Sequence, residues 1–212
     1  MLKVLFRRTV MVLLLLLIAS PVCAGGIGIF FNGGDVEAEW DGDITSIKSD
    51  GWHRDFGLTI DSNLATDRLF NYRMELGRAE WEVDSFNNSG VDADLDGLVM
   101  THTFGFGGLI APPVRLWFGP ELRFTRLDGE LDGVTAARDI DLFGYGLGAA
   151  VGLNFNLPGR MTLAAKSGFV MMRYLGNGPN LDGSVWQNSD YDVDEDLVYL
   201  GVSMYFRTTS NR

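Results

Sequence analysis

The sequence feature that most constrains the fold is a pair of strictly alternating segments on either side of a short polar link. Apolar residues occupy every second position in 56–60 and again in 70–76, and residues 62–68 form the link. Alternation with a period of two on both sides of a turn predicts an antiparallel hairpin with one apolar and one polar face. The polar face of the second strand carries Arg73 and Glu75, which is too much charge for the core of a soluble protein.

The same alternation recurs along the chain and predicts eight strands, at 27–40, 52–60, 69–83, 98–106, 116–124, 143–155, 161–171 and 198–206. In the first of them the Asn32-Gly33-Gly34 triplet predicts a bulge or bend. The links alternate in kind. Short links are predicted at 61–68, 111–114 and 156–160, and long acidic loops at 41–50, 84–96, 127–139 and 175–195. An even number of strands joined by alternating short and long links is typical of a transmembrane β-barrel.

The two faces of the predicted strands differ in a way that decides which one meets lipid. The apolar face is rich in Phe, Leu and Met and has no carboxylate in its central part, as expected of a lipid-facing band. The other face combines the glycines of 144–152 with charges such as Arg73, Arg123 and Lys166, which suits a narrow lumen better than a wet surface. We therefore predict an all-β fold, an eight-stranded antiparallel up-and-down transmembrane barrel, with a soluble periplasmic barrel as the alternative.

A barrel of eight strands leaves an interior that side chains can just fill, which argues against a wide diffusion pore. The glycines of 144–152 are expected to make room there for Arg73, Arg123 or Trp117. The link at 62–68 is expected to be the first periplasmic turn, with both chain termini in the periplasm.

The N-terminal 24 residues have the pattern of a secretory signal peptide. A basic start with Lys3, Arg7 and Arg8 is followed by an apolar run and by small residues up to Ala24, so we expect cleavage there and a barrel domain at 25–212. The single cysteine, Cys23, would be lost with the signal, so no disulfide is expected. Removing three of the 17 basic residues leaves 14 against 28 acidic ones, a net charge of −14, which argues against nucleic acid as a partner.

Several polar residues fall on the apolar face. Four arginines, Arg54, Arg78, Arg126 and Arg173, lie near the long-loop ends of their strands. At that level they could bind lipopolysaccharide phosphates, or equally pair with neighbouring aspartates. His102, between Met100 and Phe104, does not fit the pattern, and indicates a nearby boundary or a bulge.

Residues with catalytic or metal-binding potential are few. His53 and Asp55 are predicted on the lumen side with Ser49 close in sequence, but without a flanking motif an interior polar network is the better interpretation than a Ser/His/Asp triad. Asp92, Asp94 and Asp96 resemble the start of a calcium loop, but the twelfth position is Thr103 instead of Glu, which excludes an EF-hand and leaves a weak surface calcium site open. The paired glycines of 144–152 are interpreted as interior packing, because no helix follows them. We assign no catalytic, cofactor-binding or metal-binding residues.

The C-terminal segment LVYLGVSMYF adds a resemblance to a known class. Phe206 closes an alternating series with Leu200, Val202 and Met204, and it looks like the terminal signal of outer-membrane proteins, although six residues follow it, from Arg207 to Arg212. The mature chain resembles small outer-membrane β-barrel proteins of the OmpA/OmpX/OmpW type. The resemblance implies location in the outer membrane of a Gram-negative bacterium, insertion by the barrel assembly machinery, and contact with outer-membrane lipids including lipopolysaccharide. It does not imply one activity. We expect a structural or surface-interaction role in the cell envelope, with a narrow channel for small or hydrophobic solutes, or a lipid-modifying enzyme, as alternatives.

Overall fold

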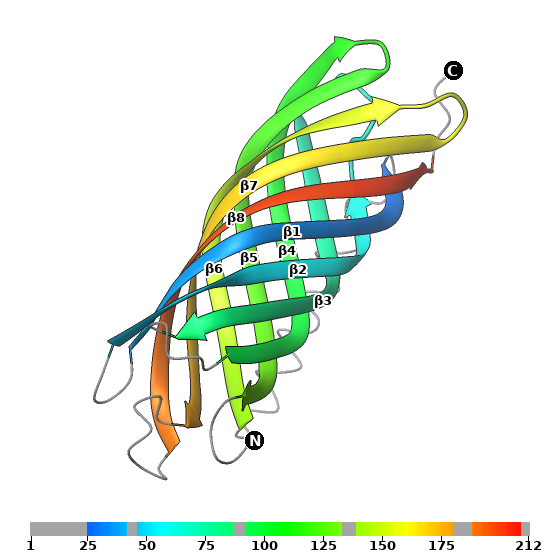
Figure 1. Ribbon diagram of the computed structural model, residues 1–212. Helices are drawn as coiled ribbons and strands as arrows, with labels where there is room; N and C mark the ends of the chain where they lie inside the picture. The colour runs from blue at the N-terminus through cyan, green and yellow to red at the C-terminus, as the bar shows by residue number, and fades with distance from the viewer. Residues whose placement is uncertain (1–24, 42–45, 87–91, 133–138, 180–187, 209–212) are drawn as a thin grey trace, which may run out of the picture.

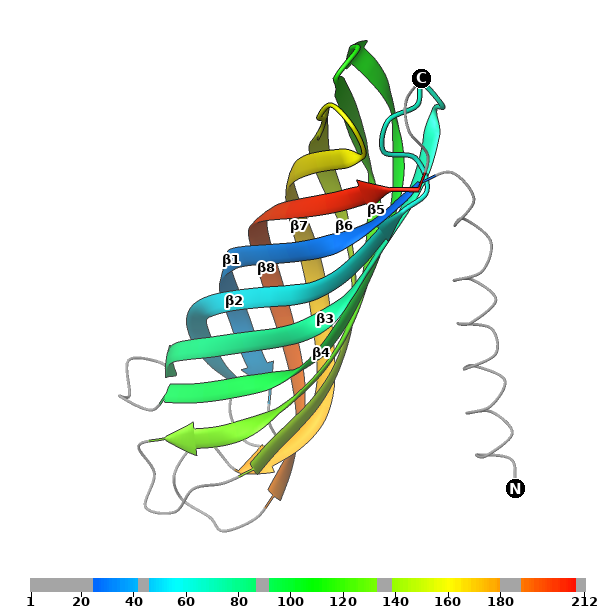
Figure 2. The ribbon, with the colours of Figure 1, turned by 90° about the vertical axis from the view of Figure 1, so that its right-hand side faces the viewer.

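The computed structural model describes residues 25–41, 46–86, 92–132, 139–179 and 188–208, and these form a closed barrel of antiparallel strands (Figures 1 and 2). The predicted fold class is confirmed. Each strand pairs with its neighbours in sequence, and the last strand pairs with the first to close the wall. The strands are β1 (Gly26–Asp41), β2 (Ser46–Asp61), β3 (Phe70–Phe86), β4 (Asp92–Ala111), β5 (Val114–Asp132), β6 (Asp139–Asn156), β7 (Met161–Pro179) and β8 (Asn188–Arg207).

The two ends of the barrel differ, and the short links lie together at one of them, here named the turn end (top of Figure 1). Pro112 and Pro113 separate β4 from β5, and neither could donate to a strand ladder. The link before β7 contains Gly159, whose φ of +82° is readily adopted only by glycine. The opposite end is named the loop end. Among the described residues no helix has the length and apolar character needed to cross a bilayer.

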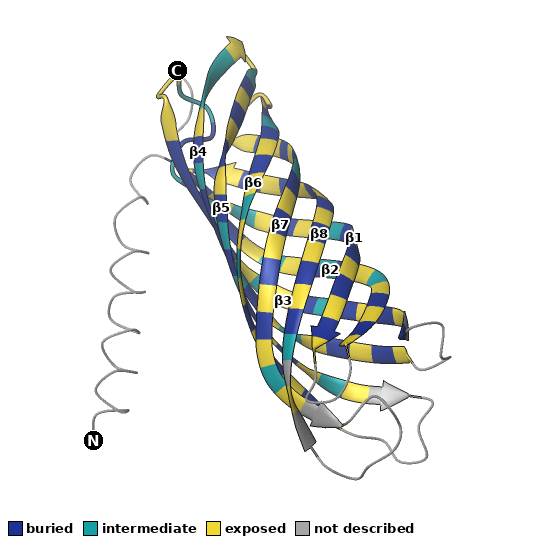
Figure 3. Cartoon of the chain, turned by 90° about the vertical axis from the view of Figure 1, so that its left-hand side faces the viewer, coloured by how far each residue is buried: buried dark blue, intermediate teal, exposed yellow. Residues whose placement is uncertain are grey.

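Inward and outward residues alternate along every strand (Figure 3). The chemistry of the two faces exchanges partway along the barrel. From the turn end the outer face is apolar, with exposed residues such as Ile29, Leu58 and Val202, and the inner face is charged. Near the loop end the outer face is acidic and the inner face is apolar. Strand β4 shows the change along a single face. The outward-facing residues change from acidic to mostly apolar, in the order Asp92, Asp94, Asp96, Leu98, Met100, His102 and Phe104.

The strands are therefore longer than the sequence analysis predicted. The segments 46–50, 92–96, 127–132, 175–179 and 188–195 were expected to be loops and instead extend β2, β4, β5, β7 and β8. The physical reason is that a barrel wall leaving the bilayer enters water, where a polar outside and an apolar inside are favoured. The alternating aspartates of 92–96 are the outer face of such an extension, and Ala93 and Leu95 between them are buried.

The predicted bulge at residues 32–34 was wrong. The register of β1 runs through Gly33 and Gly34 without a shift on either side, and the irregularities lie instead at Asp50/Gly51 in the β2–β3 ladder and at Leu109/Ala111 in the β4–β5 ladder. A side chain at Gly34 would have its Cβ 2.2 Å from the Val198 carbonyl oxygen, so the glycine permits close approach of β8.

Candidate functional site: the lumen and the charged rim

The turn end of the lumen is closed by the link between β2 and β3. Leu64 in this link is 1% exposed and packs beside Tyr205 and Ala164. The amide of Asn154 donates to the Leu64 carbonyl at 3.3 Å, and Arg115 donates to the carbonyl of Thr66 at 2.9 Å. The link is thereby fixed inside the barrel mouth.

From this closure towards the loop end, the lumen contains the charged side chains predicted from the sequence, and these charges are paired. Arg73 donates to Asp61 at 2.9–3.0 Å and to Asn154 at 3.1 Å, and its guanidinium lies 4.6 Å from the centroid of the Trp117 ring. All of these side chains are buried. Stacking on an aromatic face and donation from two nitrogens of one planar group both suit arginine better than lysine at this place.

The middle of the lumen is organised around Lys166. Its ammonium group lies 2.7 Å from Glu75 and 3.8 Å from Glu121, and all three side chains are at most 1% exposed. The Tyr199 hydroxyl donates to Glu121 at 2.8 Å, and Thr103 donates to the same carboxylate at 2.9 Å. Lys166, Glu75 and Glu121 therefore each have a partner, which low-dielectric surroundings require.

Towards the loop end, Arg123 binds both oxygens of Asp55 at 2.8 Å, and the His53 ring lies against this pair, with Nε2 3.3 Å from Asp55 Oδ1. The structure thus brings His53 and Asp55 together on the lumen side, as predicted. Ser49 is not brought to them, because its hydroxyl accepts a 2.8 Å hydrogen bond from the Trp40 indole. The three residues form no triad, and His53 belongs to an interior polar network.

The loop end of the lumen, at the bottom of Figure 1, is filled by an apolar cluster, which is named the upper core without reference to the orientation of that figure. Its members include Trp40, Trp81, Phe86, Leu127 and Tyr174, all at most 2% exposed. Trp40 and Trp81 stack with centroids 5.5 Å apart, and Phe86 meets Trp40 edge-on at 5.2 Å. The sequence analysis missed this cluster, because these residues were interpreted as parts of strands and polar loops. The persistence of period-two alternation into the acidic segments was the signal that could have found it.

The glycines of β6 make room for side chains of neighbouring strands, as predicted, but only one of the three predicted neighbours is correct. A Cβ at Gly152 would lie 2.3 Å from the Trp117 ring, which confirms that this glycine makes room for Trp117. The other glycines of β6 do not make room for Arg73 or Arg123. Cβ atoms at Gly144, Gly146 and Gly148 would instead meet the side chains of Tyr174, Met172 and Val170.

On the outside, the four predicted arginines mark the change from apolar to acidic surface, and we call Arg54, Arg78, Arg126 and Arg173 the arginine ring. Every one of them contacts a carboxylate on a neighbouring strand. Arg126 reaches Asp141 at 3.1 Å, Arg78 reaches Asp96 at 3.3 Å, Arg54 contacts Glu82, and Arg173 contacts Asp192. The ion-pair alternative of the sequence analysis is the arrangement that the structure contains.

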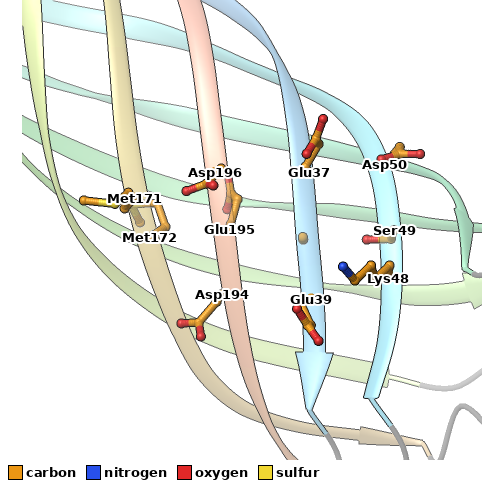
Figure 4. A pocket seen from close by; sticks show the side chains of 11 residues that line it. Glu37, Glu39, Lys48, Ser49, Asp50, Met171, Met172, Asp194, Glu195 and Asp196 are labelled. Atoms are coloured by element: carbon orange, nitrogen blue, oxygen red, sulfur yellow. The ribbon is translucent and has the colours of Figure 1, made fainter.

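Beyond the ring lies a surface named here the acidic belt. It comprises Asp35, Glu37, Glu39, Asp41, Asp50, Glu80, Glu82, Asp84, Asp92, Asp94, Asp96, Asp128, Glu130, Asp139, Asp141, Asp190, Asp192, Asp194 and Asp196. Several carboxylates are directly opposed across ladders; Glu37, for example, faces Asp196 on β8 and Asp50 on β2. Figure 4 shows these side chains around a groove of about 400 Å³ over β7, β8, β1 and β2. Like charges directly opposite each other are destabilising, so this surface is held together in spite of its charge.

The postulated calcium loop does not exist as a loop, because Asp92, Asp94 and Asp96 are spaced along the outer face of β4. Within the described ranges no group of three or more His, Cys, Asp or Glu side chains is arranged to hold a metal ion.

His102, which did not fit the sequence pattern, lies on the outer face of β4 with no bulge beside it. Its Nδ1 lies 2.6 Å from the Tyr72 hydroxyl on β3, and its ring packs edge-on against Phe124. A polar ring is tolerated on the apolar side because the hydroxyl is its partner there.

Comparison with known proteins supports the architecture. No model of a protein family matches the chain, and no curated protein sequence matches it. Among solved structures, the outer membrane protein OprG from Pseudomonas aeruginosa is similar with a TM-score of 0.56 and 14% identity over 86% of this chain and 96% of that one. The chain has the fold of the small outer-membrane β-barrels.

Two further similar structures are more distant. Neisserial surface protein A matches with a TM-score of 0.44 and 13% identity over 84% of this chain and 97% of that one. The outer membrane protease OmpT from Escherichia coli matches with a TM-score of 0.40 and 8% identity over 88% and 98%. At these identities the likeness concerns the fold alone. The exposed apolar band on the outside of the barrel has the character of a lipid-facing wall.

The final strand has the predicted form. Leu200, Val202, Met204 and Phe206 are all exposed on the outer face of β8, and Phe206 pairs with Ile27 and Met161 where the barrel closes. Arg207, the last residue of β8, donates to the carbonyls of Leu157 and Gly159 at 2.8 and 2.6 Å. The residue after the terminal aromatic is therefore tied to the β6–β7 link. The predicted signal peptide at 1–24 and the terminal residues 209–212 lie outside the described residues.

Proposed function

We propose that this barrel is a structural and surface-interaction protein of the cell envelope and that its lumen does not conduct. The observation that carries the proposal is the filling of the lumen. Leu64 closes the turn end, ion pairs occupy the middle, and Trp40 and Trp81 close the loop end, each at most 1% exposed. A packed interior of this kind leaves no continuous water path for ions.

Conductance measurements test this proposal against the narrow-channel alternative. The refolded barrel, confirmed by heat-modifiable gel migration, is expected to give no current steps in planar bilayers. The matched comparison is the double variant Trp81→Ala with Leu64→Gly. It removes one closing side chain at each end of the lumen and is expected to conduct more than the unmodified protein. Regular steps from the unmodified protein would refute the sealed lumen and favour a channel.

We propose further that the barrel is not a lipid-modifying enzyme. His53, the histidine of the interior, is 2% exposed and engaged with Asp55 and Glu195 rather than with a nucleophile. His53→Ala in cells is therefore expected to leave the lipid A profile unchanged, and a changed profile would restore the enzymatic alternative.

The outer surface supports two kinds of partner, and the first is lipid. The side chains of Arg126 and Arg78 are 66% and 51% exposed at the edge of the apolar band, where lipopolysaccharide phosphates lie. Arg126→Gln should reduce co-purified lipopolysaccharide, because Arg126 is the more exposed of the two and contacts Asp141 through one nitrogen. Arg173→Gln is the control, because Asp192 already binds two nitrogens of Arg173. Equal lipid content in all three proteins would refute this contact.

The second partner is a cationic ligand or protein segment at the acidic belt. Directly opposed carboxylates such as Glu37 and Asp196 gain stability when positive charge approaches them. Poly-lysine binding to the barrel in zwitterionic detergent, followed by calorimetry, should weaken steeply with salt. Replacing Asp92, Asp94 and Asp96 by Asn should weaken it further, and binding independent of salt would contradict the interpretation.

A further inference from the structure

The polar part of the lumen meets the upper core at one histidine. His53 lies one residue beyond Arg54 of the arginine ring on the loop-end side, where the outer surface changes from apolar to acidic. Its Nδ1 lies 3.5 Å from Glu195 Oε1 on β8, and its Nε2 lies 3.3 Å from Asp55 Oδ1 on β2. The ring stacks nearly parallel to Trp81 of the upper core, at 7° with centroids 6.4 Å apart. Each ring nitrogen thus faces a carboxylate of its own, and the ring packs against the upper core.

The formal charges at this place do not balance without a proton on the ring. Arg123 and Asp55 neutralise each other, since Nη1 and Nη2 bind the two carboxylate oxygens at 2.8 Å. Glu195 then remains. Its side chain is 0% exposed, and neither carboxylate oxygen accepts a hydrogen bond of good geometry from the described residues. An ionised carboxylate buried without a counter-charge is strongly unfavourable.

We propose that His53 and Glu195 form a proton-binding site, in which a proton held on the imidazole is the counter-charge of the buried Glu195 carboxylate and ties β2 to β8 beneath the upper core. The other groups facing the site are Asp55, Arg123 and Tyr174. Arg123 opposes the charged ring, because its Nη2 lies 3.0 Å from His53 Nε2 and a guanidinium can only donate, so this hydrogen bond favours an unprotonated Nε2. Tyr174 faces Glu195 as a neutral phenol, since burial and the Glu195 carboxylate raise its pKa well above the ordinary value.

The balance of these influences favours the protonated ring. Burial by itself lowers the pKa of His53, and Arg123 lowers it too, but the Asp55 carboxylate and the contacts with Asp55 and Glu195 outweigh both, so the pKa is raised from 6.5. A group whose pKa is raised on folding contributes stability that is complete below its unfolded pKa, about 6.5. That stability is lost as the pH rises through the folded pKa, so the sensitive window lies on the alkaline side of 6.5.

Imidazole nitrogen NMR tests the site directly, because the protein has two histidines and His102→Gln leaves the signal of His53 alone. In the full barrel carrying this substitution, we expect an imidazolium spectrum at pH 7. Adding Glu195→Gln should lower the proton affinity of the ring at least tenfold, which is one pH unit of its titration midpoint. A neutral ring at pH 7, or a midpoint that Glu195→Gln leaves unchanged, would overturn the proposal.

A second measurement does not depend on the Glu195 variant folding well. Urea unfolding between pH 6.5 and 9 should show the barrel losing stability with rising pH. His53→Gln should reduce that slope, whereas His102→Gln, which alters the lipid-facing histidine, should keep it. Equal slopes in the unmodified protein and His53→Gln would refute the site.

Discussion

Lys166 is the side chain whose loss should most clearly reveal how the lumen is stabilised. Its ammonium group serves two carboxylates, Glu75 at 2.7 Å and Glu121 at 3.8 Å, with each side chain at most 1% exposed. Lys166→Met keeps the volume but leaves two buried anions without their cation. Breaking a buried ion pair from one side costs about 3–5 kcal/mol. Since about 1.4 kcal/mol is a factor of ten, the unfolding equilibrium should shift roughly a hundredfold to a few thousandfold.

The double variant separates the ion pair from the packing. Adding Glu75→Gln removes the anion that loses most, while Glu121 keeps its hydrogen bonds from Tyr199 and Thr103. The double variant should therefore be more stable than Lys166→Met alone, by on the order of 2 kcal/mol. Replacing both partners of a buried pair is far less costly than replacing one.

Urea unfolding in lipid vesicles, followed by tryptophan fluorescence, measures these differences. Arg126→Met is the matched surface control. Its ion pair with Asp141 joins side chains 66% and 53% exposed, so solvent screening should limit its loss to less than about 1 kcal/mol. The reasoning fails if Lys166→Met costs no more than this control, or if the double variant is less stable than the single one.

Three further substitutions test other parts of the barrel by the same unfolding assay. Trp81→Ala, which empties the centre of the upper core, should cost about 3–5 kcal/mol, and a loss below 1 kcal/mol would show that the core is dispensable. Gly152→Val should cost about 1–3 kcal/mol, because its Cβ would lie 2.3 Å from the Trp117 ring; the companion Trp117→Leu should relieve the clash. Gly159→Ala meets no atom within 4 Å but requires a φ of +82°, so it should cost about 1–2 kcal/mol through the backbone alone; no change would contradict the turn geometry.

The sequence by itself determined the strand number, the antiparallel order and the lipid-facing side of the wall. The physical reason is local, because a strand exposes alternate residues to two different environments. The type of residue at each position therefore indicates which face it lies on, apolar for Phe56 and Leu58 and charged for Arg73 and Glu75. The turns were equally local, because Pro112, Pro113 and Pro158 cannot donate to a ladder. The interior position of His53 and Asp55 followed from the same alternation, because both lie on the opposite face of β2 from Phe56 and Leu58.

Only the tertiary structure decided where the strands end and which charges meet. The alternation around Asp94 was compatible with a strand, but it could not show what the intervening residues contact. Closure of the barrel was needed to show that Ala93 and Leu95 belong to the upper core. The partners of Lys166, Arg123 and Glu195 come from strands far apart in sequence, and their pairing depends on the stagger of the closed wall. Sequence alternation specifies the environment of each residue, whereas barrel closure specifies its neighbours.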